Sequence, residues 1–260
     1  MGIVNVTPDS FSDGGKFFDA ERAISHGRQL AAEGAAILDV GGESTRPGAD
    51  PVSPDDEIAR VLPVVRALAG EGYCVSIDTR RARVMKAALE CGAVIINDVT
   101  ALEGEAQSLS VVAASQASVI LMHMQGDPGT MQENPRYDDA ALDIFKYLEA
   151  RVVVCEEAGI PRSRIAVDPG IGFGKTLEHN LQIISRLGVY GGLGCPVVLG
   201  ASRKRIIGEL NDDAPVGERL CGSVAAALSG VSGGARILRV HDVADTRQAL
   251  NVWQAIQAAK

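Results

Sequence analysis

Short apolar runs and longer amphipathic stretches alternate along the whole chain, and this alternation limits the fold more than any other feature of the sequence. Each run is nearly continuous in apolar residues, which is typical of strands buried on both faces of a parallel sheet. The stretches between them have the length and apolar spacing of helices. The predicted strands are residues 2–6, 36–40, 74–77, 94–96, 119–122, 165–167, 197–199 and 237–240.

Helix boundary signals accompany the amphipathic stretches. Ser53 stands before Pro54, which is typical of an N-cap followed by proline at the first helical position. Glycines follow several stretches, where they can adopt the left-handed conformation that ends a helix; these are Gly34, Gly92, Gly159 and Gly188. The predicted helices are residues 20–33, 54–69, 81–90, 105–114, 138–157, 177–186, 217–229 and 242–257.

Eight β/α units in 260 residues predict a single (β/α)₈ barrel, a fold of about 250 residues. A doubly wound open sheet is the alternative, but the first strand is not followed by the glycine fingerprint of that fold. No linker or charge run divides the chain, so we expect one barrel domain over residues 1–260. Its active site is expected at the carboxyl ends of the strands.

Composition excludes several classes of function. The chain has 33 acidic and 25 basic residues, a net charge of −8, which argues against binding to nucleic acid or anionic membranes. No apolar segment reaches the roughly 18 residues of a membrane-spanning helix, and no secretory signal begins the chain. Five cysteines without a paired spacing favour reduced thiols and a cytoplasmic location.

Polar residues follow the predicted strands, where a barrel would bring them together. They are Asn5, Asp39, Asp78, Asn97, Asp98, His123, Asp168, Ser202, Arg203, Lys204, Arg239 and His241. One set, Asp78, Asn97, Asp168 and Lys204, offers the acceptors and donors that suit a flat polar heterocycle. A second set, Arg46, Arg239 and His241 with the hydroxyls of Ser44 and Thr45, suits a phosphate or diphosphate.

The segment after the sixth strand resembles a phosphate-binding P-loop but lacks its first glycine, because Pro169 stands there. We therefore reject a P-loop. The glycines of this segment either let the backbone and Phe173 approach a bound ring or merely build a tight turn. Of the basic residues after the seventh strand, we expect Lys204 to face the site and Arg205 to face solvent.

Two long motifs identify a resemblance. Residues 2–15 (GIVNVTPDSFSDGG) resemble the first signature of the dihydropteroate synthases, and residues 39–49 (DVGGESTRPGA) resemble the second. Shorter matches complete the set: SIDT at 76–79, IIND at 95–98, LMHMQG at 121–126, DPG at 168–170, SRK at 202–204 and RVHD at 239–242. The similarity extends over essentially the whole chain.

The resemblance implies a cytoplasmic transferase of folate biosynthesis, a TIM barrel that uses Mg²⁺ and forms a homodimer. It implies that 6-hydroxymethyl-7,8-dihydropterin diphosphate and 4-aminobenzoate are joined to 7,8-dihydropteroate, and that sulfonamides inhibit. The implied pterin-binding residues are Asp78, Asn97, Met122, Asp168 and Lys204. The implied diphosphate-binding residues are Asn5, which also binds the metal, with Thr45, Arg46, Arg239 and His241. The implied 4-aminobenzoate-binding residues are Phe11, Thr45, Pro47, Phe173 and Ser202, and the implied catalytic residues are Asp78, Lys204, Arg239 and Asp13.

An aryl amine is a weak nucleophile, so we expect catalysis to depend on departure of the leaving group, aided by Mg²⁺, Arg46 and Arg239. Two alternatives remain open. A methyltetrahydrofolate-dependent corrinoid methyltransferase would share the pterin-binding residues but would not need Arg46 and Arg239. A catalytically silent pterin-binding homologue would keep the pocket without the reaction.

Overall fold

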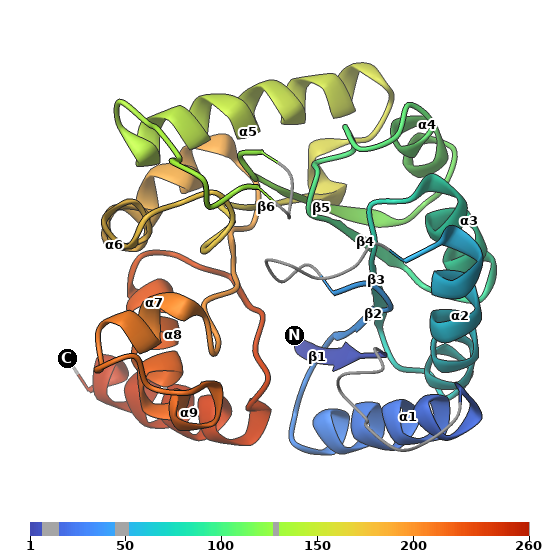
Figure 1. Ribbon diagram of the computed structural model, residues 1–260, viewed down its shortest axis with the longest axis horizontal. Helices are drawn as coiled ribbons and strands as arrows, with labels where there is room; N and C mark the ends of the chain where they lie inside the picture. Colours follow the sequence, from blue (N-terminus) through green and yellow to red (C-terminus); the bar gives the residue numbers. More distant parts are fainter. Residues whose placement is uncertain (7–15, 45–51, 127–129, 260) are drawn as a thin grey trace.

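Helices surround the parallel strands in the computed structural model (Figure 1). It describes residues 1–6, 16–44, 52–126 and 130–259. In these residues the strands are β1 (Gly2–Asn5), β2 (Leu38–Gly41), β3 (Val75–Asp78), β4 (Ile95–Asp98), β5 (Ser118–Met122), β6 (Ile165–Asp168), β7 (Val198–Leu199) and β8 (Ile237–Leu238). The α-helices are α1 (Lys16–Ala32), α2 (Pro54–Gly70), α3 (Ala82–Glu90), α4 (Ser108–Ala113), α5 (Ala140–Glu157), α6 (Leu177–Ser185), α7 (Arg205–Glu209), α8 (Leu220–Ser232) and α9 (Val243–Ala258).

The strands pair in chain order, as a (β/α)₈ barrel requires. Strands β1 to β6 form one parallel sheet, and β7 pairs in parallel with β8. Single bridges join these two sheets at both seams, between Val167 and Val197 and between Gly2 and Val240. The chain thus has the predicted (β/α)₈ architecture, but its strands form a six-stranded and a two-stranded sheet joined by single bridges and not one continuously hydrogen-bonded barrel.

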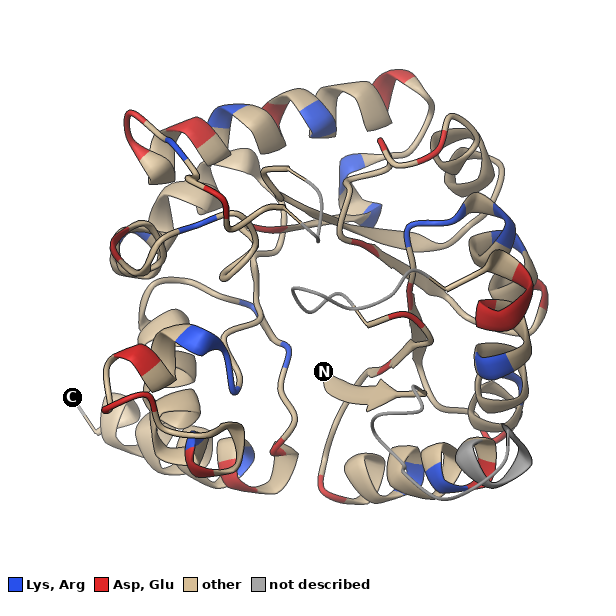
Figure 2. Cartoon of the chain, in the orientation of Figure 1, with Lys and Arg blue, Asp and Glu red and all other residues tan. Residues whose placement is uncertain are grey.

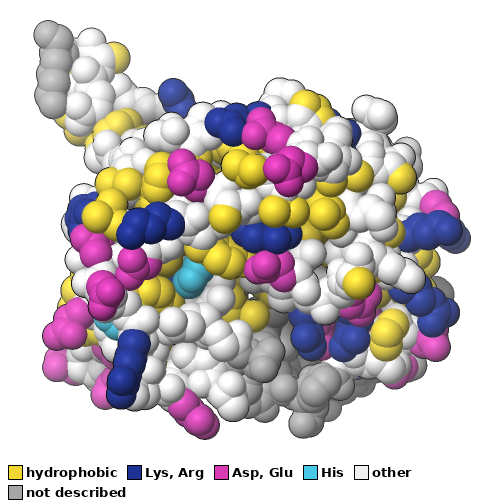
Figure 3. Space-filling view, turned by 90° about the horizontal axis from the view of Figure 1, so that it is seen from above, with side chains coloured by type: hydrophobic (Ala, Val, Ile, Leu, Met, Phe, Trp, Pro, Cys, Tyr) yellow, Lys and Arg dark blue, Asp and Glu magenta, His cyan; other side chains and the backbone are white. Residues whose placement is uncertain are grey.

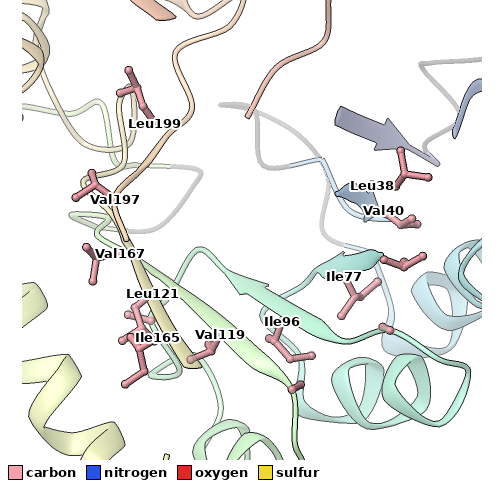
Figure 4. Packing of buried hydrophobic residues seen from close by; sticks show 14 of the residues in the cluster. Leu38, Val40, Ile77, Ile96, Val119, Leu121, Ile165, Val167, Val197 and Leu199 are labelled. Atoms are coloured by element: carbon pink, nitrogen blue, oxygen red, sulfur yellow. The ribbon is translucent and has the colours of Figure 1, made fainter. Parts of the chain in front are cut away.

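Buried side chains fill two layers on opposite sides of the strands. Val119 and Leu121 of β5 belong to the large apolar cluster between strands and helices, whose members on β2 to β6 project toward the helices (Figure 4). Ile120, between them, belongs to a small cluster with Ala166 and Val198. Because side chains alternate along a strand, this small cluster lies inside the ring. It forms a packed floor beneath the carboxyl ends of the strands.

Each predicted helix overlaps an observed one, but the boundaries differ by up to four residues: α1 begins at Lys16 and not at residue 20, α4 begins at Ser108 and not at 105, and α8 extends over Leu220–Ser232 and not over 217–229. The Ser53 side chain caps α2 by accepting a hydrogen bond from the Asp56 amide at 3.1 Å. Gly34, Gly92 and Gly159 have positive φ, as expected of glycines that follow helices. The prediction for Gly188 is wrong, because this residue lies within a 3₁₀ helix, η3 (Leu187–Leu193). The sequence also did not predict α7, which is too short to show a helical period.

Charges of both signs occur on the outer helices and also near the centre of the ring (Figure 2). The face that includes α5 shows apolar, acidic and basic side chains interspersed (Figure 3). Among the described residues, no helix has the length and apolar character needed to cross a membrane.

Candidate active site

A pocket opens at the carboxyl ends of the strands. It contains all five residues that were predicted to bind a pterin, together with Arg239 and Phe173. The lining residues are Asp78, Asn97, Val99, Met122, Asp168, Gly170, Ile171, Phe173, Gly200, Lys204 and Arg239. Convergent polar and charged groups beside apolar side chains in one opening are typical of sites that orient a small polar molecule.

Strand register explains why these side chains meet. Asp78 and Asn97 are directly paired across β3 and β4, and Met122 and Asp168 are paired across β5 and β6. Each of the four stands at or next to the last residue of its strand. Parallel strands in register therefore present a carboxylate, an amide, a thioether and a second carboxylate around one opening.

Arg239 connects the two sets of polar residues that the sequence suggested were separate. Its Nη2 donates to Asp78 Oδ2 at 2.6 Å, and its Nε donates to Asp39 Oδ2 at 2.6 Å. The same oxygen of Asp39 accepts a hydrogen bond from Asn97 Nδ2 at 3.1 Å. The expected division into a heterocycle floor and a distinct cation cluster is thus corrected, because Arg239 lies in the floor and is bonded to it.

Burial dominates the electrostatics of the pocket. It raises the pKa of Asp78 to about 7, although the charge of Arg239 acts in the opposite direction. Burial also raises the pKa of Asp168 and lowers the pKa of Lys204 to about 8. For Arg239, burial disfavours the cation, but Asp39 and Asp78 more than offset it and the pKa is raised. The guanidinium of Arg239 therefore stays charged beside Asp78 and Lys204, whose pKa values of about 7 and 8 are shifted toward neutrality, a pattern common at functional sites.

Lys204 directly precedes α7 and lies over the ring of Phe173, with Nζ 3.9 Å from the ring centroid. This cation–π contact positions the amine without neutralising it. As predicted, Lys204 faces the pocket, whereas the neighbouring Arg205 is 79% exposed and pairs with Glu209.

The glycine-containing segment after β6 is a braced turn and not a P-loop. Lys175 is buried, with Nζ 3.0 Å from His123 Nδ1, and it donates to the carbonyl of Phe173 at 2.9 Å. Asp168 Oδ1 accepts from the amide of Gly170 at 2.7 Å. These contacts fix the backbone that carries Phe173 into the pocket. Sequence reasoning missed the role of Lys175, since its partner His123 lies on a different β/α unit.

Other predicted site residues lie outside the pocket lining. Ser202 Oγ lies 3.0 Å from His241 Nδ1 and accepts from the His241 amide at 3.2 Å. Asn5 is half-buried at the end of β1, paired with Gly41 of β2. The remaining predicted residues are outside the described part of the chain: Phe11, Asp13, Thr45, Arg46 and Pro47.

An ion-pair network missed by sequence reasoning surrounds the start of the second motif. Glu43 accepts hydrogen bonds from Arg80 at 3.0 Å and Arg81 at 3.2 Å. Arg81 also donates to the carbonyl of Val52 at 2.7 Å, and Glu43 accepts from the Val52 amide at 3.3 Å. The network therefore ties β2, the start of α3 and Val52 together beside the pocket.

Comparison with known proteins agrees with this architecture. The sequence profile of the family described as "Pterin binding enzyme" matches residues 1–241, and the chain belongs to this family. A relative, the dihydropteroate synthase of Neisseria meningitidis serogroup B, is 51% identical over 98% of this chain and 92% of its own length. The solved dihydropteroate synthase of Xanthomonas albilineans with 4-aminobenzoic acid is 48% identical, with a TM-score of 0.94 over 99% of this chain and 92% of that one. A Yersinia pestis dihydropteroate synthase in complex with a sulfonamide drug is 42% identical, with a TM-score of 0.93 over 100% and 94% of the two chains.

Proposed function

We propose that this chain is a dihydropteroate synthase, which joins 6-hydroxymethyl-7,8-dihydropterin diphosphate to 4-aminobenzoate and releases diphosphate. The observation that carries the proposal is the pocket itself. Two carboxylates, an amide, a lysine and a guanidinium line one opening in a chain that belongs to the pterin-binding family.

The polar groups of the pocket match the edge of a pterin. A pterin has ring N–H and exocyclic amino donors and ring nitrogen and carbonyl acceptors. Asp168 and the oxygen of Asn97 accept from donors, and Lys204 donates to an acceptor. Met122 and Val99 cover the ring faces, since both line the same pocket and belong to one apolar cluster.

The reaction proceeds by departure of diphosphate before the weakly nucleophilic aryl amine attacks. Positive charge then develops on the pterin methylene, where the carboxylate of Asp78 stabilises it. Negative charge develops on the leaving diphosphate, and the unused N–H groups of Arg239 face that charge. No covalent intermediate with the protein is required.

The residues present fit a magnesium ion that is delivered with the substrate. Mg²⁺ in phosphate sites uses one or two protein oxygens, and phosphate oxygens and water supply the rest. Asn5 offers such an amide oxygen at the end of β1, and no group of three or more His, Cys, Asp or Glu suited to a metal occurs in the described residues. When bound, the ion would neutralise diphosphate charge.

We assign the 4-aminobenzoate site to the mouth of the pocket, between Phe173 and Ser202. Phe173 provides an aromatic face and Ser202 a hydroxyl near His241. Phe11, Thr45 and Pro47 complete this proposed site, Asp13 adds a catalytic carboxylate, and Thr45, Arg46 and His241 complete the diphosphate site. Sulfonamides are expected to compete with 4-aminobenzoate there.

Turnover with both substrates tests the proposal. Purified protein, incubated with the pterin diphosphate, 4-aminobenzoate and Mg²⁺, should form one dihydropteroate per diphosphate released. Binding of the pterin without any product would instead indicate a catalytically silent homologue. Methyl transfer from methyltetrahydrofolate to a corrinoid would indicate the alternative class.

We further propose a cytoplasmic homodimer. Val252 and Ile256 of α9 are each 58% exposed and, four residues apart, lie on one face of that helix. Such exposed apolar surface is typical of protein interfaces, and five free cysteines accord with a reducing compartment. Light scattering at micromolar concentration tests the assembly, and a monomer that persists there would contradict it.

A further inference from the structure

We infer that Asp39 is a positioning residue: one of its carboxylate oxygens orients both the amide that faces the pterin and the guanidinium that faces the diphosphate. The inference rests on the proposed function for the identity of the two ligands. Asp39 lies within β2, is completely buried and is not among the residues that line the pocket. It therefore acts on substrate only through other side chains.

The contact with Asn97 determines which atom of that amide is left for the ligand. Asp39 Oδ2 accepts from Asn97 Nδ2 at 3.1 Å, and an ionised carboxylate can only accept hydrogen bonds. The amide nitrogen must therefore face Asp39, which leaves Asn97 Oδ1 as an acceptor for the pocket. This acceptor complements a ring N–H or amino group of the pterin.

The contact with Arg239 fixes the plane of the guanidinium. Nε is held by Asp39 and Nη2 by Asp78, each at 2.6 Å. A planar group held at two points has one orientation. Without Asp39 the guanidinium would keep only the contact with Asp78 and could rotate about it.

The two oxygens of Asp39 are unequal, and this makes a sharp pair of variants possible. Both donors bond to Oδ2, whereas the buried Oδ1 has no hydrogen-bond partner among the described residues. Asp39→Asn can thus keep both acceptor contacts while it removes the charge and places an NH₂ group where Oδ1 stands. Asp39→Leu has the same number of side-chain heavy atoms in a larger volume and removes the contacts as well as the charge.

The charge of Asp39 also reaches Asp78, whose pKa it helps to raise. The charged groups that act on Asp78 come from several elements: Arg239 after β8, Lys204 before α7, Asp39 on β2, Glu57 on α2 and Asp98 on β4. Asp39→Asn removes one of the negative charges near Asp78. Asp78 is then the one carboxylate that remains bonded to Arg239 among the described residues. Both changes lower the pKa of Asp78.

The experiment combines steady-state kinetics with calorimetry, using 6-hydroxymethylpterin and inorganic diphosphate with Mg²⁺ as separate probes. For Asp39→Leu we expect kcat/KM to fall about a hundredfold, the usual cost of misplacing a catalytic group by about 1 Å, with weaker binding of both probes. For Asp39→Asn we expect pterin affinity to change by less than about threefold. Because the pKa of Asp78 falls in this variant, the decline of kcat/KM at low pH should move to lower pH. Ser76→Ala is the matched control for loss of a buried polar side chain at this place in the sheet. Ser76 is paired with Asp39 in the neighbouring strand and is equally buried, and its hydroxyl has no hydrogen-bond partner among the described residues.

The outcomes separate this inference from the proposed function. A wild-type protein that makes no dihydropteroate would refute the proposed function, while probe binding would still test Asp39. A folded Asp39→Leu variant with wild-type kcat/KM and probe affinities would refute the positioning role. Should that variant fail to fold, Asp39→Ala removes the same contacts without added bulk, and a folded Asp39→Ala variant with wild-type kcat/KM and probe affinities would refute the positioning role.

Discussion

Replacement of Asp78 by asparagine tests the proposed dissociative mechanism most directly. Burial raises the pKa of Asp78 from 3.8 to about 7, which corresponds to about 4 kcal/mol against the carboxylate form. A positive charge that develops beside the Asp78 carboxylate in the transition state would offset part of this unfavourable free energy. If most of this penalty is offset, on the order of 3 kcal/mol, the rate changes about a hundredfold, and we expect Asp78→Asn to lower kcat by about that factor.

The pH dependence provides a second measurement on the same variant. Because the pKa of this carboxyl is raised, Asp78 is ionised above pH 7 and loses its charge as the pH falls through about 7. Wild-type kcat/KM should therefore decline below that pH, and the variant should lack this limb.

A matched control separates the loss of any buried charge from the loss of this one. Asp98→Asn removes a buried carboxylate at the end of β4 that bonds to Thr100 and Leu102 and does not line the pocket. We expect lower thermal stability and a kcat within about threefold of wild type. Asp78→Asn with weaker pterin binding but an unchanged kcat would refute the charge-stabilising role.

Three further predictions follow from the geometry of the pocket. Arg239→Gln should weaken binding of the pterin diphosphate more than of the free pterin, because the removed charge faces the anion; equal losses by calorimetry would contradict this. Phe173→Ala should raise the KM for 4-aminobenzoate by about tenfold with a smaller effect on kcat, as expected for a lost aromatic contact; an unchanged KM would remove Phe173 from that site. Gly170→Ala should lower the Tm by several degrees, because φ of Gly170 is +71° and an added Cβ would lie 2.0 Å from the His123 carbonyl oxygen. Gly159→Ala is the control: φ is +91° but nothing lies within 4 Å of the added Cβ, so the Tm should fall less.

The strands could be predicted from sequence because burial on both faces leaves a local signal. All eight predicted runs contain or overlap a strand, and the polar residues that follow them mark where the sheet ends. Asp78 and Asn97 could be grouped in one site for this reason, since strand ends meet in a barrel.

Contacts between side chains of different β/α units could not be predicted in this way. Asp39 was visible as a polar residue at a strand end, but its bond to Arg239 spans 200 residues and depends on strand register. The contact of Lys175 with His123 likewise depends on how one turn packs against β5. Such pairings are set by three-dimensional packing, for which a single sequence carries no periodic signal.

The two seams of the barrel give its ligand a mechanical role. Lys204 and Arg239 follow β7 and β8, whereas Asp78, Asn97 and Asp168 stand at the ends of strands of the six-stranded sheet. In the described residues the two sheets are joined by single β-bridges and by the bonds of Arg239 to Asp39 and Asp78, and not by a continuous ladder. A molecule that contacts both groups of residues adds a further link between the two sheets. By mass action its binding free energy is added to the stability of the folded protein. An inhibitor that fills this pocket should therefore protect the protein from proteolysis while it blocks catalysis.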